Sequence, residues 1–490
     1  MKERVCSIGW ASVDITPDRP VCVAGQMYPR ISSYVHDPLT ATVLALDNGD
    51  QHCVLVSADV VNFPAAAVAA FRQQLRDIPG LDPMRVCFAA THTHNSMRCA
   101  EDPHINNSRR FFGEDRGIAW NPPGDILYGQ EEQDFVGQRL ALAVAQAWAS
   151  RSPGGLAFAQ DYAAVGFNRR PVFSLKNGGE ASKMYGACSQ DNFLRFEGAS
   201  DHLAPMLFTF DARGGLTGVA VNVNCPAQVY ELHSFLSSDY WMDARVCIRE
   251  KLGNVFILPL CGAAGDQNPL DLMRLSRTNE EPLALWSRQT GEVFRNFDMA
   301  RECRAIGRRI ADAVQRGYEE ARGAIRTAIA FRYERLRLSL PIRQVTEADY
   351  KEALVRLDDA RARLPAGQPM TMEDYLQIYE PMGVVLRWER QNQNPDYAFD
   401  VHVIRLGNAV LATNPFELFA EYGIRMRARS RAAHTLLVQL CDDAGVYLPT
   451  RAAVSGGSYS AKPATSILGP EGGDALVEET LMAIDRLFDR

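Results

Sequence analysis

The stretch from Met84 to Ser96 constrains this chain most, because it joins a buried-strand pattern to a closely spaced pair of histidines. The apolar run Val86–Ala90 passes directly into Thr91-His92-Thr93-His94-Asn95-Ser96. Such a run before a polar break is typical of a strand that ends at a sheet edge. Residues two apart on a strand share a face, so we expect His92 and His94 to point the same way. Two converging neutral imidazoles can hold a divalent metal ion. On His-x-His alone, two strand-end histidines hydrogen-bonded to backbone are an equally good interpretation.

The charge balance argues against some classes of partner. The 490 residues include 52 Lys and Arg against 59 Asp and Glu, a formal net charge of −7. This excess of acid argues against a general nucleic-acid binder and against a polybasic protein of the membrane surface. The first ten residues contain no sustained apolar segment, and no later apolar run approaches the length of a membrane span. We therefore expect a soluble, cytoplasmic protein that binds neither nucleic acid nor membrane.

The eleven cysteines are scattered along the chain without a CxxC pair. Several of them, such as Cys53, Cys87 and Cys441, fall inside apolar runs, where a free thiol behaves as a small hydrophobic side chain. We therefore expect no disulfide framework.

Strand and helix patterns alternate before the histidine pair. Two apolar runs, 41–46 and 53–58, flank Asp47-Asn48-Gly49-Asp50, and Asn-Gly between such runs is a strong hairpin signal. Residues 64–76 have a proline near their start and apolar residues on one side, which predicts a helix. This helix leads into the strand before the histidines, giving the βαβ order of a layered fold. We predict an α/β protein in which mixed β-sheets are flanked by helices.

The chain shows no evident division into domains. Residues 1–490 contain no internal repeat and no linker rich in Pro, Gly or Ser, so we predict one domain. Residues 95–130 are polar and interrupted by prolines and glycines, and because a loop of that length is usually functional we expect a lid. Residues 341–395 contain charged, periodic helices, which we interpret as a helical elaboration of the domain.

Other polar residues follow strand-like runs elsewhere in the sequence. Asp59 ends the run 53–58, and Arg169 and Arg170 follow the strand-like run 155–165. Adjacent arginines at a break can clamp a carboxylate, a phosphate or a developing oxyanion, although two solvated strand-end arginines are the commoner case. After the apolar run 254–260, the loop Gly265-Asp266-Gln267-Asn268 allows a ligand to approach the backbone closely. Ordinary turn use explains its glycine equally well.

The order of these motifs resembles the catalytic domain of the neutral (alkaline) ceramidase family. The resemblance spans nearly the whole chain, and Thr91-His92-Thr93-His94 is its most specific element. It implies an α/β fold and a zinc-dependent amidase with metal ligands at His92, Glu417 and Tyr459. It also implies that His94 lines the site next to the substrate. The other matching segments, in family order, are Gly9–Pro17, Asp37–Asp59, Asn168-Arg169-Arg170, Ser238-Asp239, Gly265-Asp266, Pro415-Phe416-Glu417, Tyr447-Leu448-Pro449-Thr450 and the loop around Tyr459.

The sequence departs from the family pattern at one metal-binding position. The family's second zinc histidine falls where this chain has Cys225-Pro226-Ala227-Gln228. Four side chains could replace that imidazole, and two of them, Gln228 through its carbonyl oxygen and His94, lie nearest to the expected site. The other two are Glu231 and His233. Losing an imidazole weakens zinc binding and favours harder metals that prefer oxygen ligands.

Other departures concern the substrate. The serine implicated in the ceramidase reaction aligns with Asn268, and we expect neither a secretion signal nor the family's C-terminal immunoglobulin-like domain in this chain. These departures indicate that the scaffold for metal-dependent hydrolysis was kept and that the lipid substrate was not.

We therefore predict a metal-dependent hydrolase that cleaves an amide (N-acyl) bond of a small polar substrate with metal-activated water. Its cofactor would be a divalent metal, zinc first, and Asp59 or Asp266 could orient a ligand imidazole. Two alternatives stay open: hydrolysis of an ester or glycosidic bond, and a binding protein that has lost turnover. A homo-oligomer is compatible with the sequence. The predicted catalytic residues are His94, Arg169, Asp266 and Asn268, the substrate-binding residues Arg170 and Gln228, and the metal ligands His92, Glu417 and Tyr459.

Overall fold

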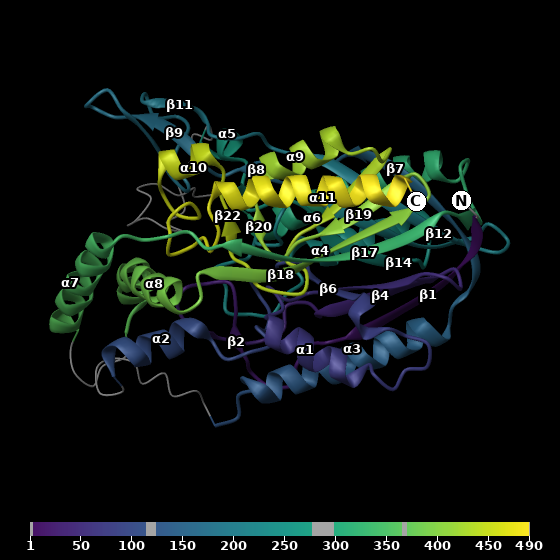
Figure 1. The fold of residues 1–490 in the computed structure, drawn as a ribbon, viewed down its shortest axis with the longest axis horizontal. Coiled ribbons are helices and arrows are strands. Elements are labelled where there is room, and N and C mark those ends of the chain that lie inside the picture. The colour runs from purple at the N-terminus through teal and green to yellow at the C-terminus, as the bar shows by residue number, and fades with distance from the viewer. Residues whose placement is uncertain (1–2, 114–123, 277–297, 365–369, 490) are drawn as a thin grey trace.

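A large mixed β-sheet forms the centre of the molecule (Figure 1). The structure is a computed structural model that describes residues 3–113, 124–276, 298–364 and 370–489. Most neighbouring strands of this sheet are antiparallel, whereas the β13–β14 and β5–β6 pairs are parallel. The strand order is β14 (Phe256–Cys261), β13 (Leu216–Val223), β12 (Leu203–Asp211), β7 (Ser152–Tyr162), β1 (Arg4–Asp14), β4 (Thr40–Asp47), β5 (His52–Ala58) and β6 (Val86–Ala90), with β16 (Ala328–Ile329) paired to β1.

A second sheet packs against one face of the large sheet. Alternate residues of a strand point to opposite faces, and β5 shows the consequence. Cys53 and Leu55 lie in the core between the two sheets, whereas Val54 and Val56 lie in the core on the outer face. The second sheet contains, in order, β17 (Phe331–Pro341), β18 (Asp396–Leu406), β19 (Ala409–Thr413) and β21 (His434–Val438).

Helices cover the outer faces of both sheets (Figure 1). α1 and α3 pack on the outer face of the large sheet near β4 and β5, and α4 and α6 pack beside them near β7 and β12. α9 and α11 cover the second sheet. The layers are therefore helices, sheet, sheet and helices. These helices span Ala65–Gln74 (α1), Gln130–Ala149 (α3), Tyr240–Leu252 (α4), Met299–Ala321 (α6), Ala420–Arg429 (α9) and Pro470–Asp489 (α11).

Many of the smaller elements gather at the end of the molecule opposite to the two termini (Figure 1). Among them, β20 and β22 form a short parallel pair that pairs Glu417 with Tyr447. The smaller elements are β2 (Cys22–Val23), β3 (Arg30–Ile31), the 3-10 helix η1 (Pro83–Arg85), α2 (Pro103–Phe112), β8 (Phe167–Asn168), β9 (Pro171–Ser174), β10 (Glu180–Ser182), β11 (Phe193–Phe196), β15 (Gln267–Asn268), α5 (Leu272–Leu275), α7 (Glu347–Arg363), α8 (Met372–Gln393), β20 (Glu417–Leu418), β22 (Tyr447–Leu448) and α10 (Arg451–Gly456).

The predicted fold class, an α/β protein with mixed sheets flanked by helices, is confirmed. The expected hairpin joins β4 and β5. Its turn is closed by Asn48, whose Oδ1 accepts a hydrogen bond from the N–H of Gln51 at 2.8 Å, and Gly49 has a φ of 83°. β5, α1 and β6 form the predicted βαβ unit, with β5 and β6 parallel.

Two segments differ in part from what the sequence predicts. The region 95–130, predicted as a lid loop, contains α2, and its residues 114–123 lie outside the described residues. In the region 341–395, α7 and α8 pack together as the predicted helical elaboration, yet Tyr379 of α8 lines the candidate site described below. The lid role and the single domain stay predictions.

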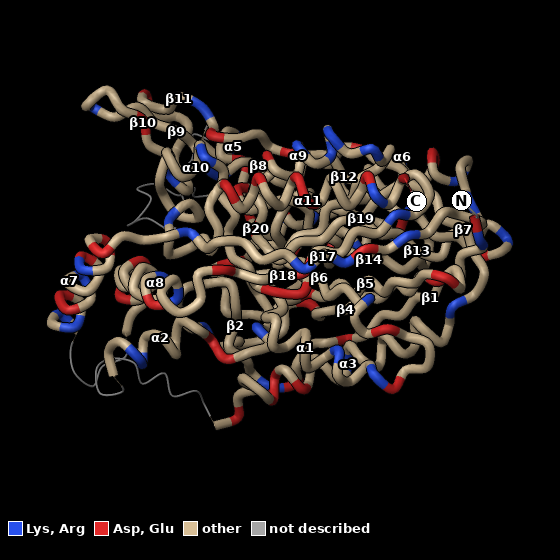
Figure 2. The backbone as a smooth tube through the Cα atoms, in the orientation of Figure 1, with Lys and Arg blue, Asp and Glu red and all other residues tan. Residues whose placement is uncertain are grey.

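The surface charge is mixed in sign. Figure 2 shows basic and acidic residues interspersed over the outer helices and loops, as expected from 52 and 59 residues of the two kinds. Within the described part of the chain, no helix combines the length and the apolar character needed to span a membrane.

Candidate metal site

The two histidines meet beyond the carboxyl end of β6, but not through strand geometry. β6 ends at Ala90, and His92 has a left-handed backbone conformation with a φ of 60°. A non-glycine residue adopts this conformation only where its surroundings enforce it. The expected strand alternation therefore does not apply to His92. The rings nevertheless converge, because the Nε2 atoms of His92 and His94 lie 3.4 Å apart and the ring planes are inclined at 88°.

His92 is fixed in the orientation that a metal ligand needs. Its Nδ1 lies 2.6 Å from the carbonyl oxygen of Val61, so Nδ1 carries the proton and Nε2 keeps its lone pair. That Nε2 lies 3.4 Å from Oε2 of Glu417, which β20 supplies from the far end of the chain. Two ligands about 2.1 Å from a tetrahedral ion lie about 3.4 Å apart. His92 and Glu417 therefore fit adjacent positions around one ion.

A cavity of about 460 Å³ opens beside this pair. His92, Glu417 and Tyr459, the three side chains expected to hold the metal, all line it. Burial, together with the Glu417 carboxylate, raises the pKa of Tyr459 to about 12, although hydrogen bonds with Tyr447 and Tyr379 act in the opposite direction.

Backbone contacts hold His94 against the cavity. Gly25 has a φ of 96°, and a Cβ there would lie 2.5 Å from Cγ of His94. The guanidinium of Arg30, buried beside this loop, donates to the carbonyl oxygens of His94 at 2.8 Å and Ala24 at 2.6 Å. Burial also lowers the pKa of His94 well below its ordinary value, so its ring is neutral.

Residues 225–228, where the resemblance to the ceramidase family predicts that a histidine is missing, pack directly behind His94. The N–H of His94 donates to the carbonyl oxygen of Ala227 at 3.2 Å. Nε2 of Gln228 donates to Oε2 of Glu231 at 2.8 Å, and the same oxygen lies 3.6 Å from Nδ1 of His94. Gln228 therefore reaches the site through Glu231 and His94.

Asn268 connects to the same network from another loop. Its Nδ2 donates to the hydroxyl oxygen of Tyr185 at 2.7 Å, and that hydroxyl donates to Oε1 of Glu231 at 3.4 Å. The residue that stands in place of the family's serine is thus two hydrogen bonds away from Glu231. This position supports a part in orienting His94 rather than direct contact with substrate.

The two adjacent arginines have different surroundings. Arg169 donates to the carbonyl oxygen of Gly265 at 2.9 Å and lies 5.3 Å from the ring centre of Tyr447, a cavity residue. Arg170 is fully buried, pairs with Glu197 at 2.7 Å and donates to the carbonyl oxygen of Tyr459 at 2.6 Å. Arg170 therefore positions the Tyr459 loop from behind.

The two buried aspartates serve neighbouring backbone and side-chain groups. Asp266 accepts hydrogen bonds from the N–H of Ala420 at 2.8 Å and from Nδ2 of Asn168 at 2.9 Å. Asp59 forms a bidentate ion pair with Arg245, in which the two nitrogen–oxygen distances are 2.8 and 3.0 Å. These contacts join the loops that carry the two aspartates to helices α4 and α9 and to β8, and the hydrogen bonds described for either carboxylate do not include His92 or His94.

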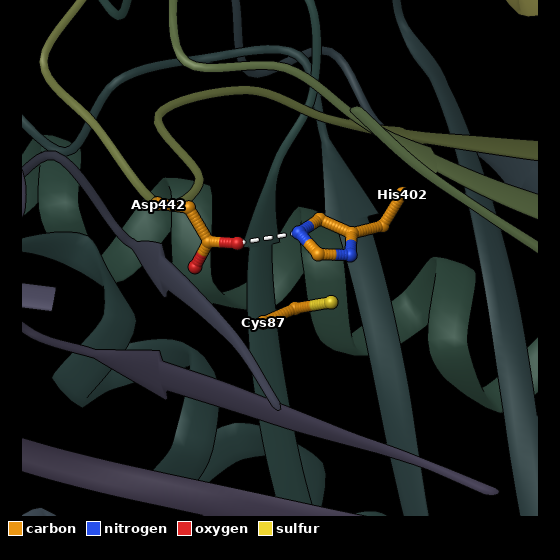
Figure 3. A group of neighbouring side chains, drawn as sticks. All are labelled: Cys87, His402 and Asp442. Atoms are coloured by element: carbon orange, nitrogen blue, oxygen red, sulfur yellow. Dashed lines mark hydrogen bonds and ion pairs between the residues drawn. The ribbon is translucent and has the colours of Figure 1, made fainter. Parts of the chain in front are cut away.

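A separate buried group also has metal-ligand chemistry. Among the described residues, one set of three His, Cys, Asp or Glu side chains has all its ligand atoms within 4.8 Å of one another: Cys87, His402 and Asp442 (Figure 3). This makes it a candidate metal-binding triad by proximity. No local pattern predicts it, because Cys87 lies on β6, His402 on β18 and Asp442 in the loop after β21.

Hydrogen bonds already engage the polar atoms of this triad. Nε2 of His402 lies 2.6 Å from Oδ2 of Asp442, and its Nδ1 lies 2.6 Å from the hydroxyl of Tyr333. Asp442 also accepts from Arg72 at 2.7 Å and from the N–H of Phe88 at 2.9 Å. Because these partners satisfy the buried groups, the triad is stable as an ion-pair network that joins the two sheets without an ion.

Sequence reasoning missed three residues that shape the site. Nothing in the sequence around Tyr379 indicates a place in the site, because the residue lies on a helix that we interpret as an elaboration of the domain. Tyr447 stands in a motif shared with the ceramidases but received no role. Glu231 was named only as one substitute for the missing histidine, and the structure places it 3.6 Å from His94.

The fold and cavity define an α/β protein with two stacked sheets and a candidate metal site where strands from both sheets end. Its fold is that of neutral ceramidase. The structure of neutral ceramidase from Pseudomonas aeruginosa matches 100% of this chain and 75% of its own, with a TM-score of 0.65 and 16% sequence identity. A ceramidase complexed with C2 matches 98% of this chain and 74% of its own, with a TM-score of 0.64 and 15% identity. No protein-family model and no curated protein sequence matches the chain.

Proposed function

We propose that this protein is a metal-dependent hydrolase that cleaves an amide (N-acyl) bond of a small polar substrate rather than ceramide. One observation carries the proposal: Nε2 of His92, with its Nδ1 tied to a carbonyl, faces Oε2 of Glu417 at 3.4 Å beside Tyr459 in one cavity. The fold shared with two ceramidases supports it.

His92, Glu417 and Tyr459 would hold the ion, with zinc the first candidate because nitrogen and oxygen ligands at this spacing suit it. When bound there, a divalent ion would lower the pKa of a water molecule toward about 7 and would polarise a carbonyl group. The chain's own part is to exclude bulk water and to fix the groups around the reacting carbonyl.

His94 is the residue placed to touch the substrate. Its Nε2 lies 3.4 Å from Nε2 of His92, and because burial lowers the pKa of the ring, the neutral imidazole would form a hydrogen bond with the substrate there. Glu231, at 3.6 Å from Nδ1, sets the direction of the ring. Gln228 and Asn268 support that glutamate from two sides, the latter through Tyr185.

Arg169 supplies positive charge behind the cavity wall. Although burial acts against it, the neighbouring Tyr447 and Tyr185 raise the pKa of Arg169 well above its ordinary value. The guanidinium therefore stays charged beside Tyr447 and can stabilise negative charge that develops at the carbonyl oxygen. Asp266 holds the start of α9 next to β20, the strand that presents Glu417.

The size of the cavity supports a small substrate. About 460 Å³ is at the lower end of the range for sites that enclose drug-sized ligands. Its lining includes polar side chains such as Gln26, Asn62 and Glu101. Two long alkyl chains in the cavity could not form hydrogen bonds with these groups, which would then lack partners.

Metal analysis combined with a substrate screen tests the proposal. The purified protein should contain about one zinc per chain, His92→Ala should contain none, and His36→Ala, which removes an exposed histidine elsewhere, should retain it. The zinc-loaded protein should release carboxylate from N-acyl compounds, and chelation should stop it. Cleavage of only esters or only glycosides would contradict the amide assignment and support the alternative bond type. Full zinc content in His92→Ala, or no turnover of any of the three classes, would overturn the proposal.

A further inference from the structure

We propose that the outer part of the cavity binds an uncharged polyhydroxylated ring, so that the substrate is an N-acylated amino sugar. This inference rests on the proposed function, because it names the substrate class of the same site. Two features of the lining support it: a row of four aromatic side chains, and a set of polar groups whose one arginine is already paired with an aspartate.

The aromatic wall runs outward from the metal ligands. Tyr447 and Tyr459 lie with ring centres 5.4 Å apart, and Tyr459 and Tyr379 follow at 6.2 Å. His104 of α2 extends the wall, with its ring centre 5.7 Å from that of Tyr379. All four line the cavity. Aromatic rings with polar tips suit ligands that have both an apolar C–H face and hydroxyl groups, as a sugar ring does.

The charged groups disfavour an anionic substrate. Arg98 is the one arginine or lysine among the described residues that line the cavity, and it pairs with Asp102 at 3.4 Å. Glu101 and Asp443 add negative charge. Burial lowers the pKa of His104, so this ring is neutral. Among the described lining residues, no second arginine or lysine is therefore present to neutralise a carboxylate or phosphate on the ring, whereas Arg169 lies behind the wall beside Tyr447.

The remaining polar groups are hydrogen-bonding partners for hydroxyls. The carboxylate of Glu101 and the amides of Gln26 and Asn62 line the cavity together with the apolar side chains of Met27 and Val61. Carboxylates accept hydrogen bonds, whereas amides both donate and accept them, which matches the donors and acceptors of ring hydroxyls.

The reaction follows from this placement. With the ring against the wall and the acyl group at His92 and His94, water adds to the acyl carbon and the carbon–nitrogen bond breaks. The hydroxyl of water stays on the carboxylic acid, and its proton goes to the leaving nitrogen. The carboxylic acid then gives its own proton to the amine, so the products are a carboxylate and the ammonium form of the amino sugar.

Binding of N-acetylglucosamine, measured by saturation-transfer NMR and calorimetry, tests the inference apart from catalysis. The wild-type protein and the His92→Ala variant should both bind it. Tyr379→Ala should weaken binding about five- to tenfold, Tyr379→Phe should keep most of it because the ring remains, and Tyr162→Ala, which removes an exposed tyrosine on β7, should change nothing.

The outcomes separate the two proposals. Binding of N-acetylglucosamine without zinc or turnover would support a binding site for a polyhydroxylated ring but overturn both the proposed function and the assignment of the substrate. Zinc-dependent cleavage of other N-acyl compounds, with no binding of N-acetylglucosamine, would overturn the inference alone. Preference for the anionic N-acetylglycine or for N-hexanoylsphingosine would also overturn it. Loss of folding in Tyr379→Ala would be detected by circular dichroism, and His104→Ala would then replace it, with the same expected weakening.

Discussion

Replacing Asp442 by Asn tests the network that joins the two sheets. The substitution keeps the shape of the side chain but removes the charge that Arg72 pairs with at 2.7 Å. The side chain of Arg72 is only 11% exposed, so its guanidinium would remain buried without its carboxylate. Breaking one partner of a buried ion pair costs about 3–5 kcal/mol. Because Arg72 also donates to the carbonyl oxygen of Val86 at 3.0 Å, we expect about 3 kcal/mol, a large part of the stability of a typical domain.

Equilibrium unfolding in urea at pH 7 measures this loss. The matched control is Asp400→Asn, whose partners Arg335 and Arg337 are 34% and 59% exposed. Exposed pairs contribute little, so the control should lose about 1 kcal/mol or less. Equal losses in the two variants would refute the reasoning. A chelator should leave the wild-type unfolding curve unchanged, and a lower stability on chelation would show that Cys87, His402 and Asp442 hold a structural ion instead.

The same variant predicts a change in pH dependence. Burial alone would raise the pKa of Asp442, but Arg72 and His402 hold it below its ordinary value. A depressed carboxyl pKa stabilises the folded state above the unfolded value, near pH 4, and this contribution is lost as pH falls through the folded pKa. The wild-type advantage over Asp442→Asn should therefore be full at pH 7 and shrink below about pH 4. A constant difference across this range would contradict the assignment.

Two further substitutions probe how the site is held. Gly25→Ala would place a methyl group 2.5 Å from Cγ of His94 at a φ of 96°, so we expect a loss of about 1–3 kcal/mol in urea unfolding, and turnover reduced more than zinc content. Arg170→Met removes the partner of Glu197 and the donor to the Tyr459 carbonyl, so the dissociation constant for zinc, measured by competition with a chelator, should rise about 10- to 100-fold. An unchanged zinc affinity in Arg170→Met would show that the loop does not need this support.

The β4–β5 hairpin and strand β6 could be predicted because the residues that specify each of them are neighbours in the sequence. Asn48-Gly49 closes the β4–β5 hairpin as its sequence requires, and the apolar run before His92 is a buried strand. The meeting of His92 with Glu417 and Tyr459 came from the order of motifs along the whole chain, since no local property links residues more than 300 positions apart.

The remaining features depend on tertiary packing. The rings of His92 and His94 converge as predicted, but not because residues alternate along a strand. The left-handed backbone conformation of His92 directs its ring toward His94. Tyr379 reaches the cavity because α8 packs beside α2, which its own periodicity does not reveal. The partners of Asp442 come from three separate elements, α1, β6 and β18, and no sequence spacing relates them.

The central claim is that one cation binds between His92, Glu417 and Tyr459. A crystal structure of the zinc-loaded protein, with anomalous diffraction recorded on both sides of the zinc edge, tests it most directly. We expect one anomalous peak within bonding distance of Nε2 of His92, a carboxylate oxygen of Glu417 and the phenol oxygen of Tyr459. A peak at Cys87, His402 and Asp442 alone, or no peak in the cavity, would contradict the account.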